Sequence, residues 1–383
     1  MDKKKILICI DWYEPGFKAG GPIRSVVNIV AALKDDFEFY ILTSAYDLGE
    51  TEPYEGIETD KWMDQGDIFI KYMSKKNLNT SSIKGNIKEI QPDAIYLNSL
   101  FSKLFTLTPL SIARRKNIAV ILAPRGMLGK GALQIKATKK KVFLSLSRLV
   151  GLYRKITWHA STTEEEAEIK KAFGNRVKVV IAQNIPMSQK LSLDYIMDRK
   201  KTGVIRFVFI SRIARKKNLK LAIECLKKCK TDTEAYFDIY GNIEEKDYYD
   251  SFKEEIKDHG QIKIAYKGVL RPSELHYVYA DADFLVLPTL HENYGHAIVE
   301  AWSNGCPVII STNTPWKNLR IKDVGWDVNI DDPENLVKAL QEGIDLDFTS
   351  YITMVRASYN YFKDHISDSE VMLANKKLFE NAV

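Results

Sequence analysis

Between residues 285 and 310, two carboxylates and a glycine separate two apolar runs. The segment reads LVLPTLHENYGHAIVEAWSNGCPVII, with Glu292 in a loop, Gly295 after it and Glu300 about one helical turn further on. A glycine just before a helix start leaves backbone N–H groups unpaired at the positive end of the helix dipole, which suits an anion such as phosphate. The two acids cannot share one helical face, so we expect them to contact different parts of one phosphate-bearing ligand. The spacing fits an alternative equally well, in which Glu292 is a solvated loop acid and Glu300 is an ordinary acid of the first helical turn.

A basic loop follows the apolar run 207–210. It holds four cations, Arg212, Arg215, Lys216 and Lys217. In doubly wound sheets ligands bind beyond the carboxyl ends of the strands, and the run 284–287 before Glu292 should end at the same crevice. Arg212 and Lys217 are therefore predicted to face a diphosphate. Arg215 and Lys216 fit a solvated charge run better.

The first glycine-rich turn, DWYEPGFKAGGPIRSVVNIV, follows the apolar run 6–10. Gly20 and Gly21 permit close approach of the backbone to a ligand, and Pro22 favours a helix start directly afterwards. The turn lacks the G-x-G-x-x-G spacing and no acid ends the second apolar run, which excludes a nicotinamide dinucleotide fingerprint. A glycine pair alone fits a plain turn as well as a ligand contact.

Apolar runs of about four to six residues alternate with longer helical patterns along most of the chain. This alternation is typical of βα units around a parallel sheet and predicts an α/β fold. Strands are expected at 6–10, 37–42, 68–72, 94–97, 119–122, 158–160 and 177–181, and again at 207–210, 237–240, 262–266, 284–287 and 308–310. Helices of the second half are expected near 217–229, 246–258, 272–280, 295–304 and 333–342.

The 383 residues are enough for two domains with separate cores. The polar stretch 187–203 interrupts both strand patterns, so the boundary is expected inside it. The sequence predicts two doubly wound domains, 1–195 and 203–350. A helical segment, 351–383, follows them and could pack on either domain, including the N-terminal one.

The composition is that of a soluble globular protein, with 45% hydrophobic and 28% charged residues. No apolar run approaches the roughly 18 residues of a membrane span, and the short apolar run at the N-terminus does not fit a signal peptide. The four cysteines are scattered and predict reduced, structural thiols. These features indicate a cytoplasmic protein.

The charge is unevenly distributed along the chain. Residues 94–163 contain thirteen Lys or Arg and no Asp or Glu, although the net charge is only +6. Within this region, the segment 130–155 mixes cations and apolar residues in a basic amphipathic pattern. It fits an ordinary helix with a solvated basic face, and it fits a helix on an anionic membrane surface, where a lipid-linked substrate would be found. No nucleic-acid partner is expected, because no nucleic-acid-binding module is recognisable.

Several segments in combination resemble the retaining glycosyltransferases of family 4, which have the GT-B fold. In the second half these are FISRIARKKNLKLAIECL (209–226) and HENYGHAIVEAWSNGCPVIIS (291–311). In the first half, GGPIRSVV (20–27) resembles the glycine loop of the family. There APRGMLGKGALQIKATKKKVF (123–143), followed by HASTTEEEAEI (159–169), resembles bacterial surface-polysaccharide members. The resemblance implies two Rossmann-like domains that face each other across a cleft, with a nucleotide sugar between them.

The resemblance also assigns roles to individual residues. Arg212 and Lys217 neutralise the diphosphate, Glu292 binds sugar hydroxyls, and Glu300 accepts hydrogen bonds from the ribose. The remaining substrate-binding residues are Gly20, Gly21, Asn293, Tyr294, Gly295, His296 and Ala297, of which the last three offer backbone contacts to the diphosphate.

The implied reaction moves a sugar from a UDP- or GDP-sugar to a saccharide acceptor, expected to be lipid-linked, in bacterial capsule, O-antigen or exopolysaccharide synthesis. Bond cleavage leaves negative charge on the diphosphate, which fixed cations and helix N–H groups stabilise. No metal or other cofactor is then expected, and Asp281 and Asp283 fit a helix-to-strand turn better than a metal site. Such an enzyme would act in the cytoplasm, peripherally at the inner face of the membrane.

One departure from the family concerns the loop after the run 119–122. Several members place a histidine there near the sugar, whereas this chain has Arg125, which is expected to meet the donor phosphate or an acidic acceptor. His159, at the end of a later strand, could enter the cleft or be a satisfied structural histidine. Two other functions stay open, namely a nucleotide-sugar epimerase of the same fold and a non-catalytic sugar-nucleotide-binding protein.

Overall fold

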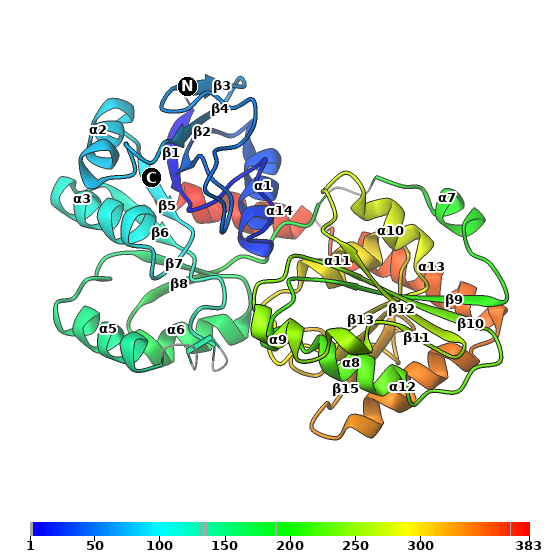
Figure 1. Cartoon of the computed structure of the whole chain (residues 1–383). Coiled ribbons are helices and arrows are strands. Elements are labelled where there is room, and N and C mark those ends of the chain that lie inside the picture. The colour runs from blue at the N-terminus through cyan, green and yellow to red at the C-terminus, as the bar shows by residue number, and fades with distance from the viewer. Residues whose placement is uncertain (1–2, 130–131, 134–136, 188–189, 368) are drawn as a thin grey trace. The chain divides into compact units, whose positions relative to one another are not determined.

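The computed structural model describes residues 3–129, 132–133, 137–187, 190–367 and 369–383 (Figure 1). The chain forms two compact units, the first comprising Met1–Ile185 and Ser369–Val383 and the second Pro186–Asp368. The division lies just before the polar stretch 187–203. The segment 351–383 is shared between the two units and does not form a body of its own.

The first unit is built on a sheet with the strand order β3-β4-β2-β1-β5-β6-β7-β8. Neighbouring strands are parallel except for the antiparallel pair β3 and β4 at one edge. The strands are β1 (Lys4–Cys9), β2 (Phe37–Ser44), β3 (Trp62–Asp64), β4 (Ile68–Met73), β5 (Ala94–Leu97), β6 (Ala119–Leu122), β7 (Thr157–Ala160) and β8 (Lys178–Ile181). All seven predicted strands are present, and β3 is an addition too short to give an apolar run.

Helices cover both faces of this sheet (Figure 1). They are α1 (Gly21–Leu33), α2 (Thr80–Ile90), α3 (Thr108–Lys116), α5 (Ala137–Leu149), α6 (Thr163–Phe173) and α14 (Ser369–Glu380), with a π-helical turn at Lys103–Leu107. α1 begins at the predicted glycine pair and buries Val26 and Val30. α14 joins the same core through Phe379, whose ring lies 5.6 Å from that of Phe37. This contact explains why the last helix of the chain belongs to the first unit.

The second unit has a sheet with the order β11-β12-β10-β9-β13-β14-β15. Its strands are β9 (Val204–Ile210), β10 (Glu234–Tyr240), β11 (Asp258–His259), β12 (Ile262–Gly268), β13 (Phe284–Leu287), β14 (Val308–Ser311) and β15 (Gly325–Val328). Only β11 is antiparallel to its neighbour. The five predicted strands are present, whereas β11 and β15 at the two edges are additions.

The helices of the second unit differ from the prediction mainly in their ends. They are α7 (Leu193–Asp198), α8 (Leu219–Leu226), α9 (Lys246–Asp250), α10 (Leu275–Asp281), α11 (His296–Ser303), α12 (Pro333–Asp345) and α13 (Phe348–His365). α8 starts two residues after position 217, because Asn218 takes a left-handed conformation with φ of 58°. The helix expected at 246–258 ends at Asp250, and a 3-10 turn follows at Lys253–Glu255. None of the helices described here is long and apolar enough to span a bilayer.

Candidate active site

The two loops that carry the predicted donor residues leave adjacent strands of the second unit. β9 and β13 are parallel neighbours, so the loops that follow them emerge at the same edge of the sheet. Both the N–H of Leu290 and the hydroxyl of Thr289 donate to the Lys216 carbonyl, at 2.8 and 3.0 Å. These hydrogen bonds hold the basic loop and the acidic loop side by side.

Lys217 and Glu292 form an ion pair between these loops. The Lys217 ammonium donates to Glu292 Oε2, and the two side chains are only 13% and 14% exposed. The Glu292 N–H is held by the Asn313 carbonyl at 2.9 Å. Burial alone would raise the pKa of Glu292, but the charges of Lys217 and Lys216 outweigh it and lower this pKa to about 2. Glu292 is therefore ionised at physiological pH, and its interpretation as a solvated loop acid is wrong.

Gly295 forms the tight turn between Glu292 and α11. Its φ of 82° lies in the left-handed region, and a Cβ atom would lie 2.8 Å from Ile298 Cδ1 and 3.2 Å from Glu292 Cγ. The first hydrogen bonds of α11 run from the N–H groups of Ile298 and Val299 to the Gly295 carbonyl. The N–H groups of residues 296 and 297 precede these bonds and have no acceptor within the helix. The helix start thus has the form that an anion site requires.

Two buried residues lie close to this helix start in the sequence, namely Tyr294 just before it and Glu300 within α11. Glu300 is 7% exposed and is the fifth residue of α11, so it lies one position beyond the first turn in which the alternative interpretation places it. The Tyr294 ring contacts those of Trp316 and His296 at centroid distances of 5.6 and 5.0 Å. Within the described chain the Tyr294 hydroxyl has no hydrogen-bond partner. Burial and the charge of Glu300 raise the pKa of this phenol, which therefore stays protonated.

Arg212 is the second residue after β9 and already has an acidic partner. Its Nη1 donates to Glu244 Oε2 at 2.5 Å, and the Arg212 side chain is 34% exposed. Glu244 comes from the loop after β10, a partner that spacing along the chain does not reveal. Arg215 pairs with Glu245 at 3.2 Å and is well exposed, in keeping with a solvated charge run. Lys216 is closer to the site than predicted, because its charge contributes to the low pKa of Glu292.

In the first unit, Arg125 follows β6 and is held by three neutral acceptors. Its Nε donates to Asn98 Oδ1 at 2.7 Å, its Nη2 to the Tyr96 hydroxyl at 2.6 Å, and its Nη1 to Asn184 Oδ1. None of these acceptors is ionised, so they orient the guanidinium without neutralising it. The residues come from the carboxyl-end side of β5, β6 and β8, where the sheet is expected to bind ligands.

His159, predicted as a substrate-binding residue, has instead the geometry of a satisfied structural histidine. It is 1% exposed, with Nδ1 2.8 Å from the Tyr96 hydroxyl and Nε2 2.8 Å from the Ala182 carbonyl. A carbonyl can only accept, which assigns the proton to Nε2 and makes Nδ1 an acceptor from Tyr96. Burial, aided by the charge of Arg125, lowers the pKa of His159 to about 3. The neutral ring therefore orients Tyr96, and through it Arg125.

The glycine turn lies beside this network. Asn98 joins the two, since its Nδ2 donates to the Pro22 carbonyl at 3.1 Å while its Oδ1 accepts from Arg125. Gly20 has a φ of 70° and directly precedes α1. Asp11, the second residue after β1, accepts from the Ser102 hydroxyl at 2.7 Å, and burial raises its pKa. Asp11 is therefore a further acid at this edge of the sheet. Its position just after the first strand is the sequence feature that could have identified it.

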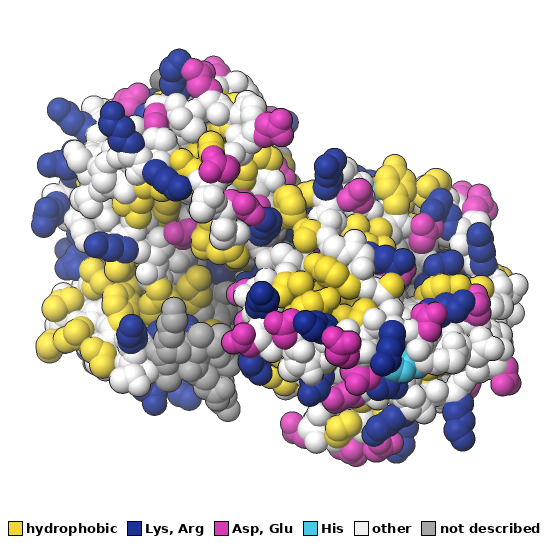
Figure 2. All heavy atoms as spheres, in the orientation of Figure 1, with side chains coloured by type: hydrophobic (Ala, Val, Ile, Leu, Met, Phe, Trp, Pro, Cys, Tyr) yellow, Lys and Arg dark blue, Asp and Glu magenta, His cyan; other side chains and the backbone are white. Residues whose placement is uncertain are grey.

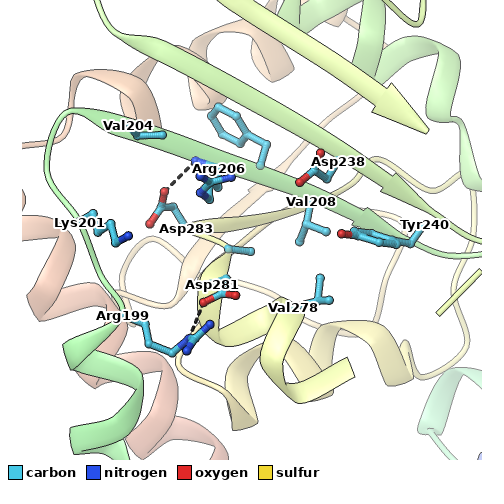
Figure 3. Close-up of a pocket in the computed structure, with 12 residues that line it drawn as sticks. Arg199, Lys201, Val204, Arg206, Val208, Asp238, Tyr240, Val278, Asp281 and Asp283 are labelled. Carbon is cyan, nitrogen blue, oxygen red and sulfur yellow. Dashed lines mark hydrogen bonds and ion pairs between the residues drawn. The ribbon is translucent and has the colours of Figure 1, made fainter. Parts of the chain in front are cut away.

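A cavity of about 500 Å³ in the second unit contains none of the predicted site residues (Figure 3). It lies over β9 and β10 beside α10, and Asp281 and Asp283 are among its lining residues. Asp281 pairs with Arg199, while Asp283 accepts from the Arg206 N–H and the Tyr351 hydroxyl, both at 2.7 Å. These partners give both acids structural roles. Among the described residues, no three His, Cys, Asp or Glu side chains are grouped as metal ligands.

Part of the chain matches a known protein family. Residues 198–360 match the family model described as glycosyl transferases group 1. An uncharacterized glycosyltransferase of Methanocaldococcus jannaschii is 25% identical over 164 residues, which are 41% of this chain and 42% of that relative. The match therefore spans less than half of the relative's length.

Solved structures resemble the chain over nearly its whole length. Anabaena HepE in complex with UDP and glucose has a TM-score of 0.73 at 15% identity, covering 99% of both chains. Sucrose-phosphate synthase from Thermosynechococcus elongatus also has a TM-score of 0.73, at 13% identity and 99% coverage of both chains. WaaG, a glycosyltransferase involved in lipopolysaccharide biosynthesis, has a TM-score of 0.68 at 12% identity, covering 97% of this chain and 99% of that chain. At these identities the likeness concerns the fold.

The fold of the whole chain resembles that of solved GT-B glycosyltransferases, and residues 198–360 match the glycosyl transferases group 1 model. The predicted fold class is confirmed, and the match supports the predicted type of protein. The region of the family match contains Arg212, Lys217, Glu292 and Glu300.

Proposed function

We propose that the chain is a retaining, metal-independent glycosyltransferase of family 4 that transfers a hexose from a UDP- or GDP-sugar to a saccharide acceptor. The observation that carries this proposal is the largely buried Lys217–Glu292 pair next to the start of α11. It brings a cation, a carboxylate and the N–H groups of a helix start together, and a sugar diphosphate needs all three.

Lys217, Arg212 and the first N–H groups of α11 bind the diphosphate in this proposal. As the bond from the anomeric carbon to the phosphate oxygen breaks, its electron pair stays on the diphosphate. Fixed cations and N–H groups stabilise that charge more in the transition state than in the ground state. The diphosphate replaces Glu244 as the partner of Arg212 and competes with Glu292 for Lys217.

Glu292 acts as a hydrogen-bond acceptor for sugar hydroxyls. With a pKa of about 2 it is ionised at neutral pH and cannot donate a proton to the leaving group. In a front-face substitution the departing phosphate takes the proton of the acceptor hydroxyl, and the new bond forms on the face that the phosphate leaves. No protein nucleophile is required, so a trapped covalent sugar–enzyme adduct would overturn this step.

The acceptor in this proposal is a lipid-linked saccharide of bacterial capsule, O-antigen or exopolysaccharide synthesis, met at the cytoplasmic face of the membrane. Support comes from the resemblance of residues 123–143 to bacterial surface-polysaccharide members. A second support is Arg125, whose guanidinium is oriented by neutral groups and is suited to an anionic group on the substrate.

The test is to incubate the full chain with UDP-, GDP- and ADP-sugars and to follow the products by proton NMR. We expect release of the nucleoside diphosphate, with the sugar first appearing in the anomeric configuration of the donor. Glu292→Ala and Arg212→Ala should abolish the release, whereas the exposed neighbour Arg215→Ala should retain it. A free product inverted at C2 would indicate the epimerase, and nucleotide binding without turnover would indicate a non-catalytic binding protein.

A further inference from the structure

Helix α5 of the first unit has two apolar sides, and the fold uses only one of them. Phe143 and Leu144 pack against the core that also contains Trp158. The ring of Phe143 meets that of Phe101 edge-on, with centroids 5.5 Å apart, and Ser147 on the same side is buried. These contacts account for the inward side of the helix.

The other apolar side faces solvent. Val142, Leu146, Leu149 and Val150 are 54%, 55%, 82% and 64% exposed. Their spacing of four, three and one residues places them on one stripe of the helix and its first residue beyond. The described chain has fifteen exposed large hydrophobic residues, and these four make up more than a quarter of them. Most of the others occur singly along the chain. Figure 2 shows the corresponding yellow patch at the lower left, over α5.

Cations lie along one side of this stripe and at its beginning. Helical spacing places Lys141 and Arg148 along one side and Lys139 in line with the stripe, about one turn before Val142, and all three are exposed. These three side chains take part in no ion pair with any residue that the structure describes. Because residues 94–163 contain no Asp or Glu, no acid of this stretch can neutralise them.

We propose that the stripe Val142–Leu146–Leu149–Val150, together with the cations Lys139, Lys141 and Arg148 around it, is a docking surface for an anionic membrane. The apolar side chains enter the boundary between headgroups and acyl chains, and these cations bind lipid phosphates. This surface would bring the enzyme to a lipid-linked acceptor. It rests on the proposed function only for that purpose, and not for the binding itself.

Charge complementarity selects the membrane over other occupants. A second copy of the chain would cover the apolar stripe, but it would bring two sets of unneutralised cations together. A nucleic acid would satisfy the cations and leave Leu149, the most exposed of the four, without an apolar partner. An anionic bilayer supplies both a negative surface and an apolar layer beneath it.

The experiment is cosedimentation of the full chain, without any donor, with phosphatidylcholine vesicles that contain or lack phosphatidylglycerol. We expect binding to the anionic vesicles, which weakens with salt. Lys139→Glu/Lys141→Glu should weaken it by at least about 25-fold, since each cation near an anionic surface contributes about five-fold. Leu146→Ser/Leu149→Ser should weaken it about ten-fold or more.

Matched controls lie on other helices of the same unit. Met372→Ser/Leu373→Ser on α14 removes two apolar side chains that are 39% and 48% exposed, and Lys84→Glu/Lys88→Glu on α2 reverses two exposed lysines. Both controls should bind the anionic vesicles like the unchanged chain. Circular dichroism melting should give the same midpoint for the stripe variants and the unchanged chain, which shows that they fold.

Three outcomes would overturn the docking surface. The first is that the unchanged chain does not bind anionic vesicles at low salt, and the second is that the control variants lose as much vesicle binding as the stripe variants. The third is a dimer in sedimentation velocity that Leu146→Ser/Leu149→Ser abolishes, in a chain that does not bind vesicles. Donor turnover does not enter this assay. A chain that binds vesicles but releases no nucleoside diphosphate would therefore contradict the proposed function and leave the docking surface supported.

Discussion

The Lys217–Glu292 pair predicts a definite cost when one partner is removed. In Lys217→Met, Glu292 keeps its largely buried place but loses the largest of the charges that hold its pKa down. The difference between the ordinary glutamate pKa of 4.5 and about 2 corresponds to roughly 3 kcal/mol. Because both side chains are less than 15% exposed, solvent screening removes little of this value, and loss of one partner from a buried pair costs about the same.

The pH dependence of this contribution has a fixed sign. The pKa of Glu292 is lower in the folded chain than in the unfolded one, so the pair stabilises the fold fully above about pH 4.5. The contribution declines as the pH falls towards 2, and less than half of it remains at about pH 3.

The assay is urea unfolding of the unchanged chain, Lys217→Met, Glu292→Gln and the double variant, followed by tryptophan fluorescence. At pH 7 we expect a coupling energy of about 2 to 3 kcal/mol, with the double variant less destabilised than the two single changes predict together. The coupling energy should decrease between pH 4.5 and 3. A coupling energy below about 0.5 kcal/mol at pH 7, the value of a solvated surface pair, would refute the reasoning.

Three further predictions concern the surroundings of the site. Gly295→Ala places a Cβ atom 2.8 Å from Ile298 Cδ1 at a φ of 82°, so it should lower the free energy of unfolding by about 1 to 2 kcal/mol and weaken nucleotide binding; unchanged melting would contradict this. His159 has a pKa of about 3, so its NMR signals should not titrate between about pH 5 and 8, and a midpoint near 6.5 would disprove the buried network. Glu244→Gln frees Arg212, so calorimetry should show tighter UDP or GDP binding, and equal or weaker binding would count against a role for Arg212.

The strands of both sheets could be predicted from the sequence because most are buried on both faces and appear as continuous apolar runs. The additional strands lie at sheet edges and lack such runs. β11 has two residues, and β15 begins with Gly325 and contains Asp327. The helical segment 351–383 could not be divided between the units, because only the packing of Phe379 on Phe37 shows where its last helix belongs.

The acids and cations of the site could be predicted because they lie at strand ends and around a helix start. Their pairing could not, since Glu292 and Lys217 are distant in sequence, and Glu244 was not recognised as the partner of Arg212. The sequence does not decide the role of His159, because its partners Tyr96 and Ala182 come from other segments. The pattern of residues 139–150 also fits two orientations of the helix, and only the packing of Phe143 against Phe101 shows which apolar side faces outward.

The central claim is that Lys217 and the start of α11 bind the diphosphate of a nucleotide sugar. Titration of UDP, GDP and their sugar derivatives into the chain, followed by thermal melting, tests it most directly, because a ligand of the folded state raises the melting temperature by mass action. We predict a concentration-dependent rise for the unchanged chain and for Arg215→Ala, and at least about ten-fold weaker binding, or about 1.4 kcal/mol, for Lys217→Ala. No rise with any of these nucleotides, or equal binding by Lys217→Ala, would contradict the claim.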